Sequence, residues 1–515
     1  MLISKPHKKI VLNSRNPNKL LTTIPTAKSF IYKDTELVAV PHKMDETQVL
    51  RNMGYKVPSP VEYQYCWSGQ YTPFEAQLET TAFLTLNNRA FCLNDMGTGK
   101  TLATLWAYDY LRDQGRVNKM LVISPLSTLE RTWADEIFRH FPHLSWAVVY
   151  GSREKRMRML KSDVDIYLIN HDGIKVLEKE LMARPDIDIV VIDEIASFRN
   201  AQTSRWKTLQ RITAARKRVW GLTGTPTPNA PTDAWAQCRL ICPDRVPKYA
   251  GAFRDQTMRQ VSAFKWVPRD TAVDIVANAM QPSIRYSRDQ CVDLPPCVYV
   301  TRQVEMSVEQ KKAYKEMLTT LFTEMQQGQV LAVNEAVKMQ KLVQIASGVV
   351  YARDGTHVEL PSQARIQETI DIIEQSNSKT IVFVPYKGVL HYVAKELGKR
   401  FSVAVINGDT PKGARDIIFK DFQHSPHPQV LVAQPYTMGH GLTLTAASTV
   451  IWYSAITSAE IYNQANARVS RPGQTHGQVI AHIEGSPVER RLYERLRQRS
   501  SMQGLLLEVV EDTEL

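Results

Sequence analysis

The segment 94–101, which reads NDMGTGKT, constrains the fold of this chain more than any other part of its sequence. It follows the apolar run 90–93, which predicts a short buried strand. It precedes residues 102–111, where apolar residues recur with the spacing of a helix. A strand, a glycine loop and a helix in this order are the context of a phosphate-binding loop. We therefore expect a nucleotide phosphate to bind here, although Asn94 stands where the general pattern has its first glycine.

Each residue type in this loop has a physical role in holding a phosphate. The two glycines allow the backbone to curl so that its N–H groups face the anion. The lysine can reach the terminal phosphates, and the threonine hydroxyl can bind magnesium. The alternative is a glycine turn that ends in Lys-Thr by chance, and the motifs downstream count against it. The expected nucleotide-binding residues of the loop are Met96, Gly97, Thr98, Gly99, Lys100 and Thr101.

Gln77 lies shortly before the predicted strand of the phosphate loop. A glutamine amide can hydrogen-bond both edges of an adenine, which would give a preference for ATP. In isolation this residue would be read as an ordinary exposed helix residue. Its position ahead of the loop favours adenine binding.

Four further apolar runs alternate with helical patterns downstream of the loop, and each ends in a polar motif. This alternation predicts an α/β fold with a parallel sheet. Open parallel sheets bind ligands at the carboxyl ends of their strands, so the polar motifs are expected to meet at one edge. The runs with their motifs are 120–123 before Ser124-Pro125, 166–169 before 170–172, 187–192 before 193–196, and 219–222 before 223–226.

Asp193 and Glu194 follow the third of these runs and are the candidate hydrolytic pair. Asp193 can hold magnesium, and Glu194 can orient and deprotonate the attacking water. Acidic pairs are common on protein surfaces. A pair at a strand end downstream of a phosphate loop is far more specific.

A second alternating region begins near residue 380, with apolar runs at 380–384, 403–406, 430–433 and 450–453. It ends in the segment 464–474, which contains Arg468 and Arg471. These two arginines are three residues apart, on one face of a predicted helix end. They can contact the terminal phosphate of a nucleotide across a cleft, as arginine fingers. The alternative is an amphipathic helix with two solvated arginines.

The composition is that of a globular protein with several domains. The chain has 515 residues, 43% of them hydrophobic and 23% charged, and a net charge of +12 that favours a polyanionic partner such as nucleic acid. No apolar run is long enough for a membrane span, and the first residues do not form a secretory signal. Six cysteines predict reduced thiols and a cytosolic compartment. The alternative is a zinc site built from Cys238, Cys242, Cys291 and Cys297.

Three regions lie outside the two alternating segments. Residues 1–68 predict a small N-terminal β-β-α domain with a hairpin around 30–40, a short helix near 45–53 and a linker. This domain either packs as an appendage or grips DNA through its basic residues. Residues 243–376 predict a helical insertion between the lobes, and residues 501–515 a tail. The basic residues in question are Lys5, Lys8, Lys9, Arg15 and Lys19.

The motifs 97–101, 193–194 and 222–226 resemble motifs I, II and III of superfamily-two helicases. The sequences of segments 94–101 and 222–229 are similar to those of the Swi/Snf-type translocases. Segments 439–447 and 464–474 resemble motifs V and VI of the same family. Through motif V the resemblance adds Gly441 to the nucleotide-binding residues. One departure is Ala196, where the family has histidine, which puts in doubt that residue's contact to motif III. The resemblance covers about residues 69–500.

This resemblance implies two RecA-like parallel-sheet lobes, at 69–242 and 377–500, with ATP and magnesium in the cleft between them. It implies an ATP-dependent motor that tracks double-stranded or branched DNA and remodels DNA structures or bound proteins. The compact size suggests a bacterial or phage member, cytoplasmic in the bacterial cell or infected host, and nuclear only if eukaryotic. The alternatives are a strand-separating helicase on DNA or RNA, a defence-system subunit, and a DNA-binding scaffold with residual ATPase.

Overall fold

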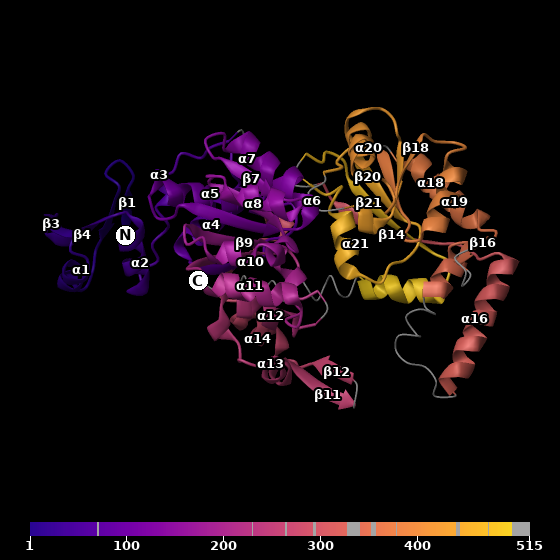
Figure 1. The fold of residues 1–515 in the computed structure, drawn as a ribbon, viewed down its shortest axis with the longest axis horizontal. Coiled ribbons are helices and arrows are strands. Elements are labelled where there is room, and N and C mark those ends of the chain that lie inside the picture. Colours follow the sequence, from indigo (N-terminus) through magenta and orange to yellow (C-terminus); the bar gives the residue numbers. More distant parts are fainter. Residues whose placement is uncertain are drawn as a thin grey trace. The chain divides into compact units, whose positions relative to one another are not determined.

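The structure is a computed structural model that describes residues 1–69, 72–228, 230–262, 265–291, 295–326, 340–351, 357–376, 378–438, 443–471 and 473–496. The chain divides into two compact units, and the boundary between them follows Cys291. The first unit contains an N-terminal sheet and the first lobe, and the second contains the second lobe (Figure 1).

The N-terminal part folds into an antiparallel sheet with two helices. The predicted hairpin and helix are present as β3, β4 and α2, but the sheet has four strands rather than two. The two additional strands are short, and the lysines and proline around them hide any alternating pattern. Ile10, Val38 and Leu50 belong to its hydrophobic core. The elements are β1 (Leu2–Ser4), β2 (Lys9–Leu12), α1 (Pro17–Thr23), β3 (Lys28–Tyr32), β4 (Thr35–Pro41) and α2 (Met44–Asn52), and the sheet order is β1-β2-β4-β3.

The first lobe is built on a parallel sheet of seven strands. Its central strands are almost wholly buried, as expected for a parallel sheet covered on both faces. In spatial order the strands are β13 (Ser283–Ile284), β5 (Arg89–Cys92), β10 (Arg218–Leu222), β9 (Ile187–Asp193), β6 (Lys119–Ser124), β8 (Ile166–Asn170) and β7 (Trp146–Val149).

Helices cover both faces of this sheet, and alternate strand residues enter two separate cores (Figure 1). On one face Val122 and Val191 pack with residues of α4 (Glu75–Leu86), α5 (Lys100–Asp113) and α7 (Asp135–His140). On the other face Ile123 and Ile192 pack with helices that come later in the chain. These are α8 (Arg153–Lys161), α9 (Gly173–Val176), α10 (Glu178–Met182), α11 (Ser204–Ala214), α12 (Asp233–Ile241), α13 (Ala250–Thr257) and α14 (Ala272–Ala279).

The region after residue 242, predicted as a helical connector, contributes strands to both sheets. Strand β13 pairs with β5, and the backbone N–H groups of Phe91 and Leu93 donate to the carbonyls of Pro282 and Ile284. A hairpin of β11 (Met258–Ser262) and β12 (Lys265–Pro268) also falls in this region. Strand β14 (Cys297–Gln303) joins the sheet of the second lobe. The sequence signal is weak because β13 has two residues and β14 is mostly exposed.

The second lobe is a parallel sheet of six strands with helices on both faces (Figure 1). Helices α18 (Gln363–Gln375) and α19 (Lys387–Leu397) pack on one face, and α20 (Lys412–His424) and α21 (Ala459–Asn466) on the other. Helix α16 (Val308–Gln326) and the hairpin of β15 (Val349–Tyr351) and β16 (His357–Glu359) precede them. In spatial order the strands are β14, β21 (Gln478–Glu484), β20 (Ala447–Trp452), β17 (Lys379–Phe383), β19 (Val430–Ala433) and β18 (Val403–Ile406).

The predicted fold class is therefore confirmed: two α/β lobes with parallel sheets, preceded by a small α+β domain. Among the described residues, no helix combines the length and the apolar character that crossing a membrane requires.

Candidate nucleotide-hydrolysis site

The phosphate loop connects β5 to α5 in the first lobe, as the sequence predicts. Gly97 and Gly99 have φ of 83° and 78°, in the left-handed region that other residues rarely adopt. Gly99 is the N-cap residue of α5, and a Cβ atom on it would lie 1.9 Å from Nε2 of Gln77. This position therefore requires glycine for both its backbone angle and its space.

Lys100 points back into the loop. Its ammonium donates hydrogen bonds to the carbonyls of Asn94 at 2.7 Å and Asp95 at 2.9 Å. Thr98 closes the same turn by donating from Oγ1 to the Asp95 carbonyl at 2.8 Å. Met96 and Thr101 are partly exposed in the loop and in the first turn of α5. The loop thus gathers a positive charge and a helix N-terminus, which are the two features that attract phosphate.

Asn94, which replaces the first glycine of the pattern, has a structural role. Its Nδ2 donates to Oγ1 of Thr80 on α4 at 2.8 Å, and its Oδ1 accepts from the N–H of Tyr286 at 3.0 Å. The next residue, Asp95, forms an ion pair with Arg285 at 2.9 Å. The end of β5 is thereby fastened to α4 and to the segment after β13, so the loop has a fixed base.

Gln77 lies against the loop, and its side chain is buried. Its Oε1 accepts the N–H of Phe74 at 2.9 Å, and its Nε2 faces Gly99. The glutamine therefore ties the start of α4 to the phosphate loop. Contact with an adenine remains a proposal.

The acidic pair lies at the carboxyl end of β9, at the same edge of the sheet as the phosphate loop. Asp193 is paired in register with Leu222, which is itself paired with Cys92 on β5. Glu194 has a φ of 52°, which is costly for a residue with a side chain and is typical of functional turns. This turn sets the Glu194 carboxylate beside β10.

Glu194 is buried, and Oγ1 of Thr223 donates a hydrogen bond to its Oε1 at 2.8 Å. Thr223 itself is fixed because its Oγ1 accepts the N–H of Thr225 at 3.1 Å. A Cβ atom on Gly224 would lie 3.3 Å from the backbone nitrogen of Met96. Segment 223–226 therefore joins the glutamate to the phosphate loop. The family has a histidine at position 196 that contacts this segment, and this chain has Ala196 there instead. In this chain Glu194 contacts the segment through Thr223.

Asp193 is held by two residues that sequence reasoning did not assign to the site. The indole Nε1 of Trp133 donates to its Oδ2 at 3.0 Å, and Nε2 of His171 donates to its backbone carbonyl at 2.8 Å. Trp133 lies in the π-helical turn η1 (Leu129–Ala134), and such turns are frequent at functional sites. A local sequence pattern does not show that this tryptophan points toward Asp193, because its direction depends on the irregular turn.

The two candidate arginines differ in their surroundings within the second lobe. Helix α21 ends at Asn466, so both arginines follow it rather than sharing its face as predicted. Arg468 is 1% exposed, and its carbonyl accepts the N–H of Leu444 at 3.0 Å. Arg471 is partly exposed, and its guanidinium donates to Oγ1 of Thr443 and the carbonyl of Ala467, both at 3.4 Å. Arg471 is therefore the more accessible of the two, while Gly441 lies outside the described residues.

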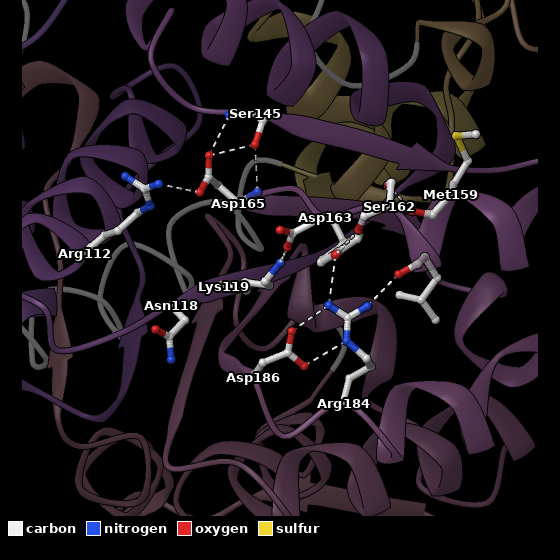
Figure 2. Close-up of polar contacts among 12 residues, drawn as sticks. Arg112, Asn118, Lys119, Ser145, Met159, Ser162, Asp163, Asp165, Arg184 and Asp186 are labelled. Atoms are coloured by element: carbon white, nitrogen blue, oxygen red, sulfur yellow. Dashed lines mark hydrogen bonds and ion pairs between the residues drawn. The ribbon is translucent and has the colours of Figure 1, made fainter.

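The opposite edge of the first sheet, where the strands begin, has a different character (Figure 2). Charged side chains there pair with one another: Arg112 with Asp165 and Arg184 with Asp186, both at 2.6 Å, and Lys119 with Asp163. At the carboxyl edge, Trp133 and Thr223 donate hydrogen bonds to the two carboxylates of the candidate pair. Because the phosphate loop follows β5 at this same edge, we expect the hydrolytic chemistry here.

The six cysteines are free thiols. Cys238 is buried and donates to the carbonyl of Ala279 at 3.3 Å, and burial raises the pKa of Cys291 to about 11. Among the residues that the structure describes, no three His, Cys, Asp or Glu side chains cluster as metal ligands would. The four cysteines considered for zinc are not brought together as such a group.

Two family models match this chain. The SNF2-related domain matches residues 81–353, and the helicase conserved C-terminal domain matches residues 364–473. They cover both parallel sheets except for β21, and they include the phosphate loop, the acidic pair and both candidate arginines.

Curated relatives are similar over most of the chain. "Putative protein p41" of Acyrthosiphon pisum secondary endosymbiont phage 1 is 26% identical over 81% of this chain and 93% of its own length. The putative ATP-dependent helicase/translocase YwqA of Bacillus subtilis is 23% identical over 76% of this chain, which spans 44% of that longer protein.

Among solved structures, the SWI2/SNF2 ATPase core of Sulfolobus solfataricus in complex with dsDNA is 22% identical, with a TM-score of 0.42 over 86% of this chain and 94% of the other. Because the SNF2-related model alone matches more than half of the sequence, the chain belongs to the SNF2-related family of superfamily two, and it is a nucleic-acid-dependent ATPase.

Proposed function

We propose that this ATPase is a motor that moves along double-stranded or branched DNA and uses its steps to remodel DNA structures or displace bound proteins. The observation that best supports the proposal is the hydrogen bond from Thr223 to the buried Glu194, because the neighbouring Gly224 lies against the phosphate loop. The net charge of +12 and the helicase/translocase name of the Bacillus relative support a nucleic-acid track.

The first lobe supplies the groups that bind and attack the phosphate. Residues Lys100, Thr101 and Asp193 suit ATP with magnesium because they offer an ammonium, a hydroxyl and a carboxylate, and Mg²⁺ prefers oxygen ligands. Magnesium held by Thr101 and Asp193 would neutralise charge on the terminal phosphates. Lys100 exchanges its two loop carbonyls for phosphate oxygens. Trp133 and His171 keep Asp193 in position.

Glu194 acts as the general base for the attacking water. Its carboxylate is oriented by the hydrogen bond from Thr223 and would accept the water's proton. Thr223 is a positioning residue, and Gly224 packs on the loop, so a shift of the loop on phosphate binding would reach the glutamate. Gln77, together with Met96 and Gly97–Gly99, would complete the nucleotide site, with Gln77 at the adenine.

The second lobe supplies arginines that complete the site when the lobes close. Arg471 is the first candidate for the finger because it is partly exposed, whereas Arg468 is 1% exposed. Arg468 is buried, which suits a residue that supports the finger segment or enters the site after a rearrangement. Gly441 belongs to the same proposed nucleotide contacts of this lobe. DNA bound across both lobes would stimulate hydrolysis by favouring closure.

One assay separates this proposal from its alternatives: the steady-state ATPase rate without nucleic acid and with single-stranded, double-stranded and forked DNA or RNA. We expect duplex or forked DNA to stimulate most, with no release of a labelled strand from a blunt duplex. Strand release would instead show a helicase, and an ATPase rate that no nucleic acid changes would indicate a scaffold.

A further inference from the structure

The N-terminal sheet has one face covered by helices and one face without them. Residues Val38 and Val40 of β4 enter the core beneath α1 and α2, together with Leu20 and Leu50 of those helices. Successive residues of a strand point to opposite faces, so Leu37 and Ala39 lie on the other face. We call this second surface the open face of the N-terminal sheet.

The strand register shows which side chains share the open face. Residues directly opposite each other in an antiparallel pair lie on the same face. Phe30 is paired with Leu37 and Lys28 with Ala39, while Ile31 is paired with Glu36 and so lies on the helix side. The open face carries Lys9, Val11, Lys28, Phe30, Tyr32 and Leu37 among its strand residues.

Two aromatic side chains stand exposed on this face. Phe30 is 41% and Tyr32 is 58% exposed, although large aromatic residues of a small domain are usually used for its core. They are two residues apart on the edge strand β3, which places their Cβ atoms roughly 7 Å apart. The lysines that share the face are Lys9 and Lys28, and the strand positions of the open face, all among the described residues, include no carboxylate.

The N-terminal segment is also strongly basic. Residues 1–57 contain ten lysines and arginines and four acids, so they carry +6 of the net charge of +12. Of the five basic residues singled out in the sequence, Lys9 lies on the open face, whereas Lys19 lies on α1 and Lys5 stacks on Tyr63 at 4.9 Å. The positive charge favours binding of a polyanion, and the strand register identifies the open face as the surface that would bind it.

We propose that the open face of the N-terminal sheet is a binding platform for single-stranded DNA. Phe30 and Tyr32 would stack on two successive bases, and Lys9 and Lys28 would contact the phosphates on either side. Exposed aromatic residues on a sheet, flanked by basic residues, bind single strands with little sequence preference because every base has a stacking face. A protein partner for this surface would need acidic residues beside apolar ones. Single-stranded DNA supplies both negatively charged phosphates and aromatic bases.

The platform is fixed to the first lobe. Met44 of α2 packs in a core of that lobe with Val61, and Asp45 forms an ion pair with Arg116 at 2.6 Å. A strand on the open face would therefore be held at a set distance from the first lobe. This extends the proposed function: the chain would prefer forked or gapped DNA to a blunt duplex.

The decisive experiment measures binding of a labelled oligothymidylate of roughly a dozen nucleotides to the full chain, without nucleotide, by fluorescence anisotropy. Replacing both rings by Phe30→Ala and Tyr32→Ala should weaken binding by about tenfold or more, because two stacking contacts are lost. Tyr32→Phe in an otherwise unchanged chain should bind normally, since it keeps the ring. Ile31→Ala is the matched control, because Ile31 is 78% exposed on the same strand but on the other face.

The two lysines are tested through the salt dependence of the same binding. Lys9→Gln with Lys28→Gln should lower the slope of log affinity against log salt by roughly 1.4, the value for two phosphate contacts to a single strand. An unchanged slope would overturn the role of the lysines.

Three results would contradict the proposal that the open face binds single-stranded DNA. The first is unchanged oligothymidylate binding by the Phe30→Ala, Tyr32→Ala protein. The second is an equal loss in Ile31→Ala. The third is self-association in sedimentation velocity that the double variant abolishes while oligothymidylate binding stays normal, which would make the face a contact between two copies. Stimulation of ATPase by duplex DNA is measured on the same proteins, so failure of the platform and failure of the motor proposal are distinguishable.

Discussion

The sheets of the two lobes have the same strand order, but their chemistry differs. Five strands of the first lobe run β10-β9-β6-β8-β7, and five of the second run β21-β20-β17-β19-β18. In both sets the five strands follow one another along the chain in the same way. Each set has a further strand beside its last one, β5 next to β10 and β14 next to β21, and the first sheet continues beyond β5 with β13. Shared topology therefore cannot explain why the candidate site is in the first lobe.

The additional strand makes the first difference. Three of the four β5 residues are buried, the strand is flanked by β13, and it leads into the phosphate loop. Strand β14 is largely exposed and leads toward α16. The glycine loop needs a rigid base, and a buried strand with neighbours on both sides provides one.

The ends of corresponding strands make the second difference. Strand β9 ends in Asp193 and continues to Glu194, which meet Trp133 and Thr223. Its counterpart β20 is followed by Tyr453 and Ser454. There the Tyr453 carbonyl accepts a hydrogen bond from the buried Arg365 guanidinium. The hydroxyl groups of Ser454 and Ser347 are hydrogen-bonded at 2.7 Å. We propose that this position serves hydrolysis in the first lobe, whereas in the second lobe it joins buried elements to one another.

The largest expected effect comes from the loop that only the first lobe has after its additional strand. Lys100→Ala should abolish ATP turnover, because the ammonium stabilises charge on the transferred phosphate. Circular dichroism should show an unchanged fold, since Lys100 is partly exposed. A folded Lys100→Ala protein with wild-type turnover would contradict the assignment.

We expect the second largest effect from Glu194→Gln. The amide keeps the shape of the side chain but cannot take a proton, so hydrolysis should fall by roughly a hundred- to ten-thousandfold while ATP binding persists. Ser454→Ala at the corresponding strand end of the second lobe is the control, and it should affect stability rather than chemistry. Loss of ATP binding in Glu194→Gln would point to a structural role instead.

Thr223→Val tests the positioning of the base. Removing the donor to Glu194 should lower the single-turnover rate by about tenfold, the scale of a lost hydrogen bond to a charged group, with little change in ATP affinity. Thr223→Ser keeps the hydroxyl and should restore the rate. Equal rates for the valine and serine variants would show that this hydrogen bond does not orient the base.

The smallest expected effect concerns the ion pair of Asp45 and Arg116 in the first unit. The hydrogen bond from Arg116 lowers the pKa of Asp45 below its usual value, so the pair stabilises the folded chain above about pH 4 and less as the pH falls through the folded pKa. Asp45 is largely exposed, so Asp45→Asn should cost at most about 1 kcal/mol at neutral pH. Urea titrations at pH 7 and pH 3 should therefore separate the variant from wild type only at the higher pH.

The motifs with fixed spacing could be predicted from the sequence, and the partners that hold them could not. The loop 94–101, the pair Asp193 and Glu194, and the parallel sheets follow from local pattern and strand order. The roles of Asn94 and Trp133 depend on contacts with Tyr286 and Asp193, which lie 192 and 60 residues away in the chain. Strand β13 pairs with β5 across a similar separation, and its two residues have no period of their own.

The central claim is that a residue of the second lobe completes the site of the first, and Arg471→Ala tests it most directly. Single-turnover hydrolysis is measured with and without duplex DNA beside a nucleotide-binding titration, with Arg400→Ala, an exposed arginine of the same lobe, as control. We predict near-normal nucleotide binding, hydrolysis slower by roughly a thousandfold, loss of DNA stimulation, and incomplete rescue by Arg471→Lys, which lacks the planar fork. Near-normal, DNA-stimulated hydrolysis by Arg471→Ala would contradict it.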